Sequence, residues 1–151
     1  MVLMIAAILL LLPAIIAPLR RNNFYLIHAS LTALAAYFIE NRYFPQADIA
    51  DFIAGWKSVM LIFIVLHLTF INLTTFIAYG VDKRAAQRGA WRIPEMQLHS
   101  LEFLGGWGGA LLGQVFFHHK NKKRSFQAFF WALLFLELGL IFGILKYMNF
   151  I

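Results

Sequence analysis

The stretch DKRAAQRGAWRIPE, residues 82–95, decides the fold of this chain. It follows an uncharged apolar run at 58–79 and precedes a second apolar run that contains GGWGG. Another basic stretch, HHKNKKR at 118–124, comes shortly afterwards. Apolar runs separated by clusters of Lys and Arg are typical of a helical membrane protein whose basic residues lie at the membrane surface.

Composition supports this interpretation. Of 151 residues, 62% are hydrophobic and only 13% are charged, whereas soluble domains contain about 25% charged residues. The net charge of +6 is concentrated in short clusters, which suits anionic lipid head groups better than a nucleic-acid groove. The chain has no Cys, which excludes disulfides, thiolate metal sites and Cys nucleophiles.

Four apolar stretches are predicted to cross a membrane, because a crossing needs about 20 apolar residues and lipid admits only helices or closed barrels. They are 2–19, 24–39, 58–79 and 125–145. The first has its charges after the apolar core, so we interpret it as a retained signal anchor with Arg20 and Arg21 on the cytoplasmic side. The predicted class is an all-α integral membrane bundle of four transmembrane helices plus a Gly-rich re-entrant or fifth helical segment.

Residues 96–117 leave two alternatives open. If they cross the membrane and the N-terminus is outside, seven Lys and Arg residues lie in the cytoplasm and six lie outside. If they dip in and return to the same side, ten lie inside and three outside. The positive-inside rule therefore favours the dip.

Local sequence is compatible with either alternative. Pro94 and Glu95 suit a helix start, and the glycines of GGWGG suit a turn between two half-helices. Conversely, Gly105, Gly109 and Gly113 are spaced by four, which predicts a face for close helix packing in a true span.

The spacing of several short motifs resembles a bacterial inner-membrane family catalogued as domain of unknown function 1294. The motifs are DKRAA (82–86), RIPE (92–95), GG (105–106), GAL (109–111), HK (119–120) and SF (125–126). The resemblance extends from about residue 61 to 145, and it implies a membrane location without an activity. On this basis 1–57 is an N-terminal two-helix extension and 58–151 is the family membrane unit, together forming one compact bundle. Some relatives look like fusions to a cold-shock domain, which we expect to be absent here, so no nucleic-acid partner is expected.

The basic residues are the first candidate site. We expect them to converge on one cytoplasmic face that binds anionic lipid or an acidic partner, with Trp91 at the interface. The alternative is that they only set the topology. The candidates are Lys83, Arg84, Arg88, Arg92, His119, Lys120, Lys122, Lys123 and Arg124.

Two further candidates involve polar residues within or near the apolar runs. His67 and Glu137 are predicted at similar depths, either as a structural pair or as a proton or cation site. His99 and Glu102, with His118 and His119, are residue types that bind Zn or Fe. No metal motif supports such a site, so we expect interfacial hydrogen bonding and neither metal nor cofactor.

The sequence therefore predicts a small multi-pass protein of the bacterial inner membrane, with its N-terminus outside and its basic loops in the cytoplasm. We expect it to be non-enzymatic, with membrane lipids and a second copy or another membrane protein as partners. The alternatives are an oligomeric transporter or channel that uses His67 and Glu137, and a membrane enzyme that acts on a lipid head group.

Overall fold

The computed structural model describes residues 23–43 and 49–147. These residues form helices and connecting loops, and none of them lies in a β-strand, which confirms the all-α class. The predicted span at 2–19 lies outside the described residues, as do Arg20 and Arg21. Residues 1–74 and 75–151 form two compact units, and each is described by itself.

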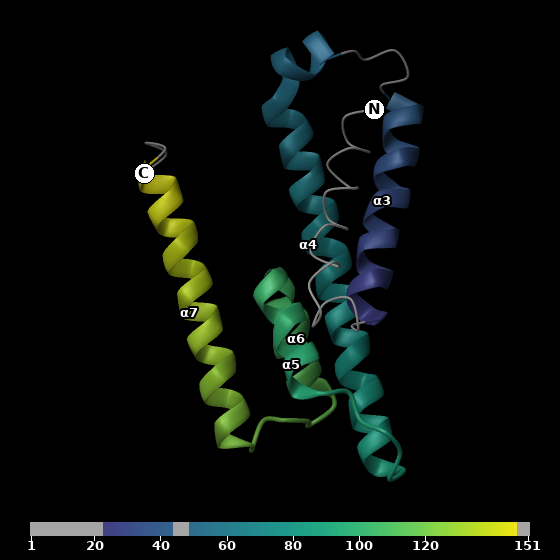
Figure 1. Cartoon of the computed structure of the whole chain (residues 1–151), viewed down its shortest axis with the longest axis vertical. Helices are drawn as coiled ribbons and strands as arrows, with labels where there is room; N and C mark the ends of the chain where they lie inside the picture. Colours follow the sequence, from purple (N-terminus) through teal and green to yellow (C-terminus); the bar gives the residue numbers. More distant parts are fainter. Residues whose placement is uncertain (1–22, 44–48, 148–151) are drawn as a thin grey trace. The chain divides into compact units, whose positions relative to one another are not determined.

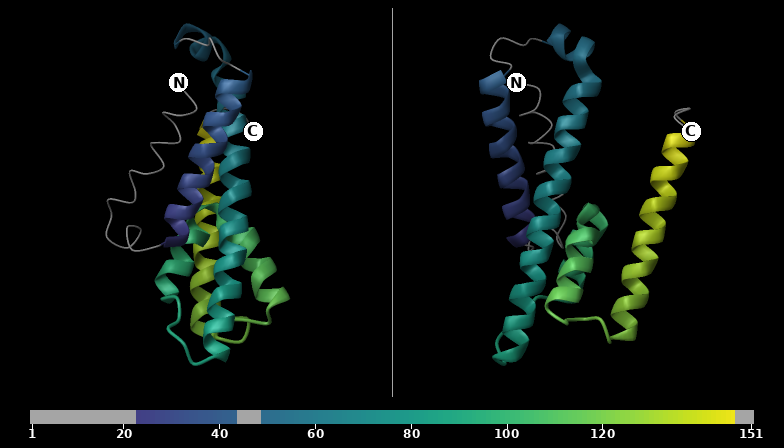
Figure 2. Two further views of the ribbon diagram at one scale, coloured as in Figure 1. Left: turned by 90° about the vertical axis from the view of Figure 1, so that its right-hand side faces the viewer. Right: turned by 180° about the vertical axis from the view of Figure 1, so that it is seen from behind.

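The first unit pairs α3 (Asn23–Tyr43) with the first part of α4 (Ile49–Gln87), as Figures 1 and 2 show. Both helices are longer than the apolar runs 24–39 and 58–79 that predicted them. Ala36 is fully buried at the centre of their contact, where its small side chain allows close approach. The side chains packed around it are Ala33, Ile39, Ile62, Phe63 and Leu66.

The end of α4 corrects one expectation, because residues 82–87 belong to this helix and not to a loop. Lys83, Arg84 and the alanines that follow are good helix formers. The helix ends at Gln87, and Gly89 follows with a φ of 63°, in the left-handed region. The N–H of Ala90 donates to the carbonyl of Ala85 at 3.0 Å, as in a Schellman C-cap.

The segment after the first basic stretch turns back on itself. It comprises α5 (Glu95–Leu101), a π-helical turn η2 (Glu102–Gly106) and α6 (Trp107–Phe116). As predicted, α5 begins directly after Pro94. Gly105 has a φ of 96° and kinks the helix, a conformation that favours glycine. Figure 2 shows α5 and α6 meeting at this kink, while their other ends both point toward the end of α4 and the start of α7.

Glycines allow the returning segment to approach α4 closely. A Cβ atom on Gly113 would lie 2.8 Å from the Cβ of Tyr79, and one on Gly106 would collide with the hydroxyl of Thr75. Of the three glycines predicted to share a packing face, Gly113 makes such a contact and Gly109 is buried in the same helix. Gly105 lies in the kink instead.

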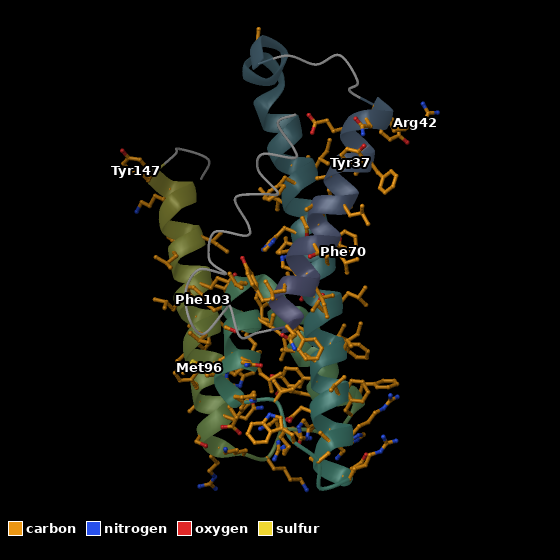
Figure 3. All side chains as sticks on the ribbon, turned by 45° about the vertical axis from the view of Figure 1, so that its right-hand side comes forward. Tyr37, Arg42, Phe70, Met96, Phe103 and Tyr147 are labelled. Atoms are coloured by element: carbon orange, nitrogen blue, oxygen red, sulfur yellow. The ribbon has the colours of Figure 1, made fainter. Side chains whose placement is uncertain are left out.

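The last helix, α7 (Arg124–Tyr147), is almost entirely apolar along its length. Two helical segments of the described residues are long and apolar enough to cross a membrane, Leu61–Gln87 and Arg124–Gly143. Within the most apolar 18 residues of each segment, only 22% and 17% are buried. The core helix of a soluble protein would be mostly buried. Side chains such as Phe135 and Phe142 are exposed, and Figure 3 shows the side chains of the described residues, with Tyr147 labelled at the end of α7.

Replacing Gly113 by Ala tests the close packing. We expect Gly113→Ala to lower the free energy of unfolding by about 1–3 kcal/mol, because the added methyl group overpacks the contact with Tyr79. Gly139→Ala on α7 is the control, since nothing lies within 4 Å of a Cβ at that position, and it should raise stability by up to about 1 kcal/mol. Unfolding of the full chain in detergent measures both, and equal effects would contradict the packing.

Candidate functional site

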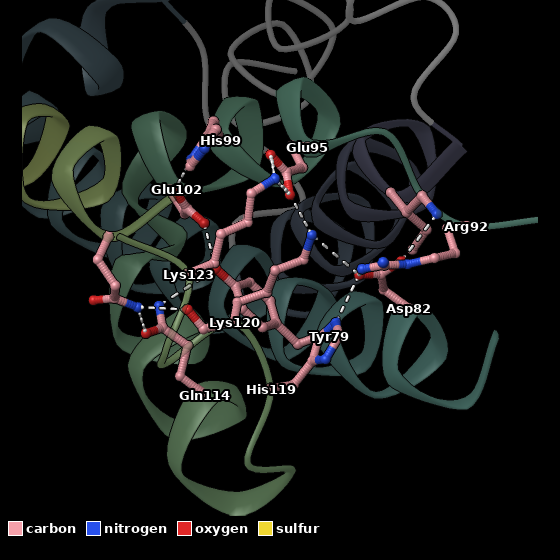
Figure 4. A network of polar contacts seen from close by, with 12 residues as sticks. Tyr79, Asp82, Arg92, Glu95, His99, Glu102, Gln114, His119, Lys120 and Lys123 are labelled. Atoms are coloured by element: carbon pink, nitrogen blue, oxygen red, sulfur yellow. Dashed lines mark hydrogen bonds and ion pairs between the residues drawn. The ribbon is translucent and has the colours of Figure 1, made fainter. Parts of the chain in front are cut away.

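The carboxylate of Asp82 is the centre of a cluster that joins the two basic stretches. Asp82 is fully buried on α4. It accepts hydrogen bonds from Arg92 Nε and Nη2, at 3.2 and 3.0 Å, and from the backbone N–H of Ile93 at 3.2 Å. His119 Nε2 donates to it at 2.7 Å. These donors come from both sides of the α5–α6 hairpin, so the carboxylate ties residues 92–93 and 119 to the end of α4 (Figure 4).

Glu95 is the second carboxylate of this cluster. It accepts from Lys120 Nζ at 2.6 Å and from Lys123 Nζ at 2.7 and 2.8 Å. Hydrogen bonds from Lys120, then Lys123, lower the pKa of Glu95 to about 2. Lys120 Nζ also lies 3.8 Å from Asp82, so this lysine bridges the two carboxylates.

These ion pairs connect the two basic stretches. Asp82 pairs with Arg92 of its own stretch, and their hydrogen bonds raise the pKa of Arg92. The ion-pair partners of Glu95 come from the second basic stretch. The HHKNKKR and DKRAAQRGAWRIPE stretches consequently lie side by side.

A second polar cluster surrounds Tyr79, which precedes Asp82 by about one helical turn on α4. Tyr79 donates its hydroxyl hydrogen to Glu102 Oε1 at 2.5 Å, and His99 Nδ1 lies 2.6 Å from Glu102 Oε2. Gln114 Nε2 donates to the Tyr79 hydroxyl oxygen at 3.4 Å. Tyr79, His99, Glu102 and Gln114 are all buried. The network continues through Gln127, which donates to Gln114 at 2.5 Å and to the carbonyl of Lys120 at 3.0 Å.

The ring of His99 borders a pocket between α5 and α7. It stacks on Phe126, with 4.3 Å between ring centroids, and lies 4.5 Å from the Phe129 ring. The pocket has a volume of about 230 Å³. Its walls are formed by Glu95, Met96, His99, Ser125, Phe126 and Phe129.

The nine basic candidates divide into two groups. Arg92, His119, Lys120 and Lys123 are bound to Asp82 or Glu95. The other five form no ion pair with any residue in 23–43 or 49–147, and all but the half-buried Lys83 are exposed. These are Lys83, Arg84, Arg88, Lys122 and Arg124, hereafter the unpaired cations.

The other predicted polar residues lie elsewhere. In the first unit, His67 Nδ1 is 3.1 Å from Nε2 of the buried His28, a contact that sequence reasoning missed. Glu137 lies half-buried on α7 in the second unit, so its pairing with His67 stays a prediction.

His119 is bound to Asp82 rather than joined with His99 and Glu102, and His118 is exposed. Within the described residues, no group of three or more His, Asp or Glu side chains could hold a metal ion.

Asp82→Asn tests the first cluster. We expect it to lower the free energy of unfolding by about 2 kcal/mol, since Arg92 and His119 lose a charged, buried acceptor. The neighbouring Lys83→Gln is the control and should change stability by less than about 0.5 kcal/mol, as is usual for surface substitutions. Unfolding in detergent at neutral pH measures both, and an Asp82→Asn variant as stable as the control would contradict this role.

The low pKa of Glu95 predicts a stability change in acid. A pKa lowered from 4.5 to about 2 on folding contributes stability that is complete above pH 4.5 and is lost as the pH falls toward 2. Because Glu95 is partly exposed, we expect this contribution to be no more than about 1 kcal/mol. Glu95→Gln should flatten the change in unfolding free energy across this pH window. Curves with the same slope for both proteins would contradict the assignment.

Comparison with known proteins places these clusters in a family. The family described as "Protein of unknown function (DUF1294)" matches residues 72–126, which include Tyr79, Asp82, Glu95, His99 and Glu102. An uncharacterized protein of Bacillus subtilis, YsdA, is 41% identical over 78 residues, which make up 52% of this chain and 88% of YsdA. No solved structure matches the chain significantly. Since the model of this family matches the chain, and the chain covers 88% of a relative that is 41% identical, this protein belongs to the DUF1294 family.

Proposed function

We propose that this chain is a multi-pass protein of the bacterial inner membrane that binds anionic lipid head groups through its unpaired cations. The observation that carries the proposal is the division of the basic residues into two groups. One group is neutralised internally by Asp82 and Glu95. The other group has no acidic partner among the described residues, so its charge is available to a ligand outside the chain.

A membrane location is supported by the apolar surface of the helices. Residues 61–87 and 124–143 are long and apolar enough to span a membrane. Leu138, Ile141 and Phe142 on α7 are all exposed, and water would be an unfavourable environment for such a surface. Four spans, with the N-terminus outside, are the arrangement that we propose from the apolar runs of the sequence.

The fold of the hairpin supports placing the basic stretches on one side of that membrane. His119 contacts Asp82, and Lys123 contacts Glu95, so both stretches lie at the same end of the second unit. If the hairpin dips and returns, ten of the thirteen Lys and Arg residues lie in the cytoplasm. That bias is the one that the positive-inside rule requires.

Anionic lipid is the ligand that suits this surface best. Each Lys or Arg near an anionic membrane contributes about 1 kcal/mol, so five unpaired cations supply up to about 5 kcal/mol. Trp91, which is 91% exposed beside this cluster, is the residue type that prefers the membrane interface. An acidic protein partner would use the same charges but would not require an exposed tryptophan beside apolar helices.

Replacing all five unpaired cations by Gln tests the proposal. We expect the purified variant to retain at least tenfold less phosphatidylglycerol than the wild type, since up to about 5 kcal/mol of attraction is removed. Native mass spectrometry of the full chain, extracted in mild detergent from vesicles of equal phosphatidylglycerol and phosphatidylethanolamine content, measures the retained lipid.

The matched control replaces Arg42, Lys57 and Lys146 by Gln, because these residues are predicted on the opposite side. This variant should retain phosphatidylglycerol as the wild type does. Unchanged retention in the five-residue variant would reject the proposal, and an equal loss in both variants would show that net charge alone, and not this surface, holds the lipid.

A further inference from the structure

We infer that the pocket beside His99 is a specific site for the phosphate head of one lipid molecule, with His99 Nε2 as the hydrogen-bond donor. The inference rests on one part of the proposed function, the membrane location, because it requires anionic lipid at this end of the second unit. It goes further by assigning a single site to a residue outside the unpaired cations.

The imidazole of His99 is held in a fixed orientation. Glu102 lies 2.6 Å from Nδ1, and the other oxygen of Glu102 is fixed by the Tyr79 hydroxyl at 2.5 Å. An ionised carboxylate can only accept, so Nδ1 donates. The stacking of the ring on Phe126 restricts its rotation further.

The second nitrogen of the ring is open to a ligand. His99 is only 6% exposed, and Nε2 has no hydrogen-bond partner among the described residues. Every buried side-chain nitrogen or oxygen of those residues has a partner. Nε2 is therefore accessible, and the space that His99 borders is the pocket between α5 and α7. Sites that bind small molecules usually combine such a directed polar atom with apolar walls.

The walls of the pocket are suited to an amphipathic ligand. Phe126, Phe129 and Met96 supply apolar surface, and Ser125 supplies a hydroxyl group. A volume of about 230 Å³ is below the 300–1,000 Å³ of pockets that enclose whole drug-sized ligands. It accommodates a head group and the start of a chain, while the rest of the chain continues along the exposed apolar side of α7.

The charges around the pocket favour an anion. Glu95 also lines the pocket, but it is bound by both Lys120 and Lys123, so this group of three carries a net positive charge. Arg124, one of the unpaired cations, directly precedes Ser125. For Nε2 to donate to a phosphate oxygen while Nδ1–H remains on Glu102, His99 takes up one proton from solvent when the ligand binds, and Glu102 balances the charge of the resulting imidazolium.

Two variants distinguish lipid binding in this pocket from lipid binding at the unpaired cations. His99→Asn keeps an amide donor for Glu102 but has no atom in the place of Nε2. Met96→Trp fills the pocket from a residue that is 59% exposed and outside the Glu102 network. We expect dihexanoyl phosphatidylglycerol to bind the full chain in detergent with one saturable site. His99→Asn should weaken that binding about tenfold, the effect of losing one hydrogen bond to a charged group. Met96→Trp should weaken it at least as much, because the indole ring occupies the space of the ligand.

The nitrogen signals of His99 provide a second measurement. In protein labelled with ¹⁵N-histidine, the signal that is missing from His99→Asn identifies this ring. Addition of the lipid should move its Nε2 resonance to the protonated position, whereas a merely structural His99 would not respond. Inorganic phosphate at the same concentration should displace little lipid, because it lacks the apolar part. Equal displacement by phosphate would overturn the lipid assignment.

The outcomes distinguish this inference from the proposed function. Wild-type affinity in both His99→Asn and Met96→Trp rejects the site, even when the five-residue variant loses its retained lipid. If His99→Asn does not fold, Met96→Trp and the Nε2 signal of the wild type decide. If the five-residue variant retains its lipid while both pocket variants lose theirs, the surface proposal fails and the phosphate site stands.

Discussion

The buried carboxylate of Asp82 is the interaction on which residues 75–151 depend. A charge that is removed from water is tolerated only when donors surround it. Asp82 meets this requirement with Arg92, the N–H of Ile93 and His119. Those donors lie before α5 and after α6, so satisfying one carboxylate also fixes where the hairpin begins and ends. Lys120 extends the arrangement to Glu95, which joins the two basic stretches by a second set of ion pairs.

Two residues of α4 that precede this carboxylate, Tyr79 and Thr75, pack against glycines of the returning segment. Tyr79 holds the Glu102–His99 pair, and Gly113 provides the space for the tyrosine ring. Thr75 lies against Gly106 next to the kink. Because Glu102 is fixed from two sides, the position of His99 is determined by α4 although the residue belongs to α5. The pocket beside it is therefore built on a rigid support, which is what a selective site requires.

Sequence patterns predicted much of this structure, but only where a pattern has a local cause. The all-α class, the helix start after Pro94 and the turn at GGWGG follow from hydrophobicity, the fixed φ of proline and the conformational freedom of glycine. The charge count favoured a segment that returns, and the contact of His119 with Asp82 agrees with that geometry.

The helical state of 82–87 was missed because the charges suggested a loop. The partners of Glu95, the role of Gln114 and the contact of His28 with His67 depend on chain segments that meet only in three dimensions, and no local pattern encodes them.

The distance along the chain between Asp82 and its partners has a consequence for biosynthesis. Arg92 follows Asp82 by 10 residues, but His119 follows by 37. At about 5–20 residues per second, the ribosome delivers the histidine roughly 2–7 s after the aspartate. During that interval Arg92 and the N–H of Ile93 have already been synthesised, whereas His119 has not. The set of donors around Asp82 is therefore completed only when the chain that follows α6 emerges.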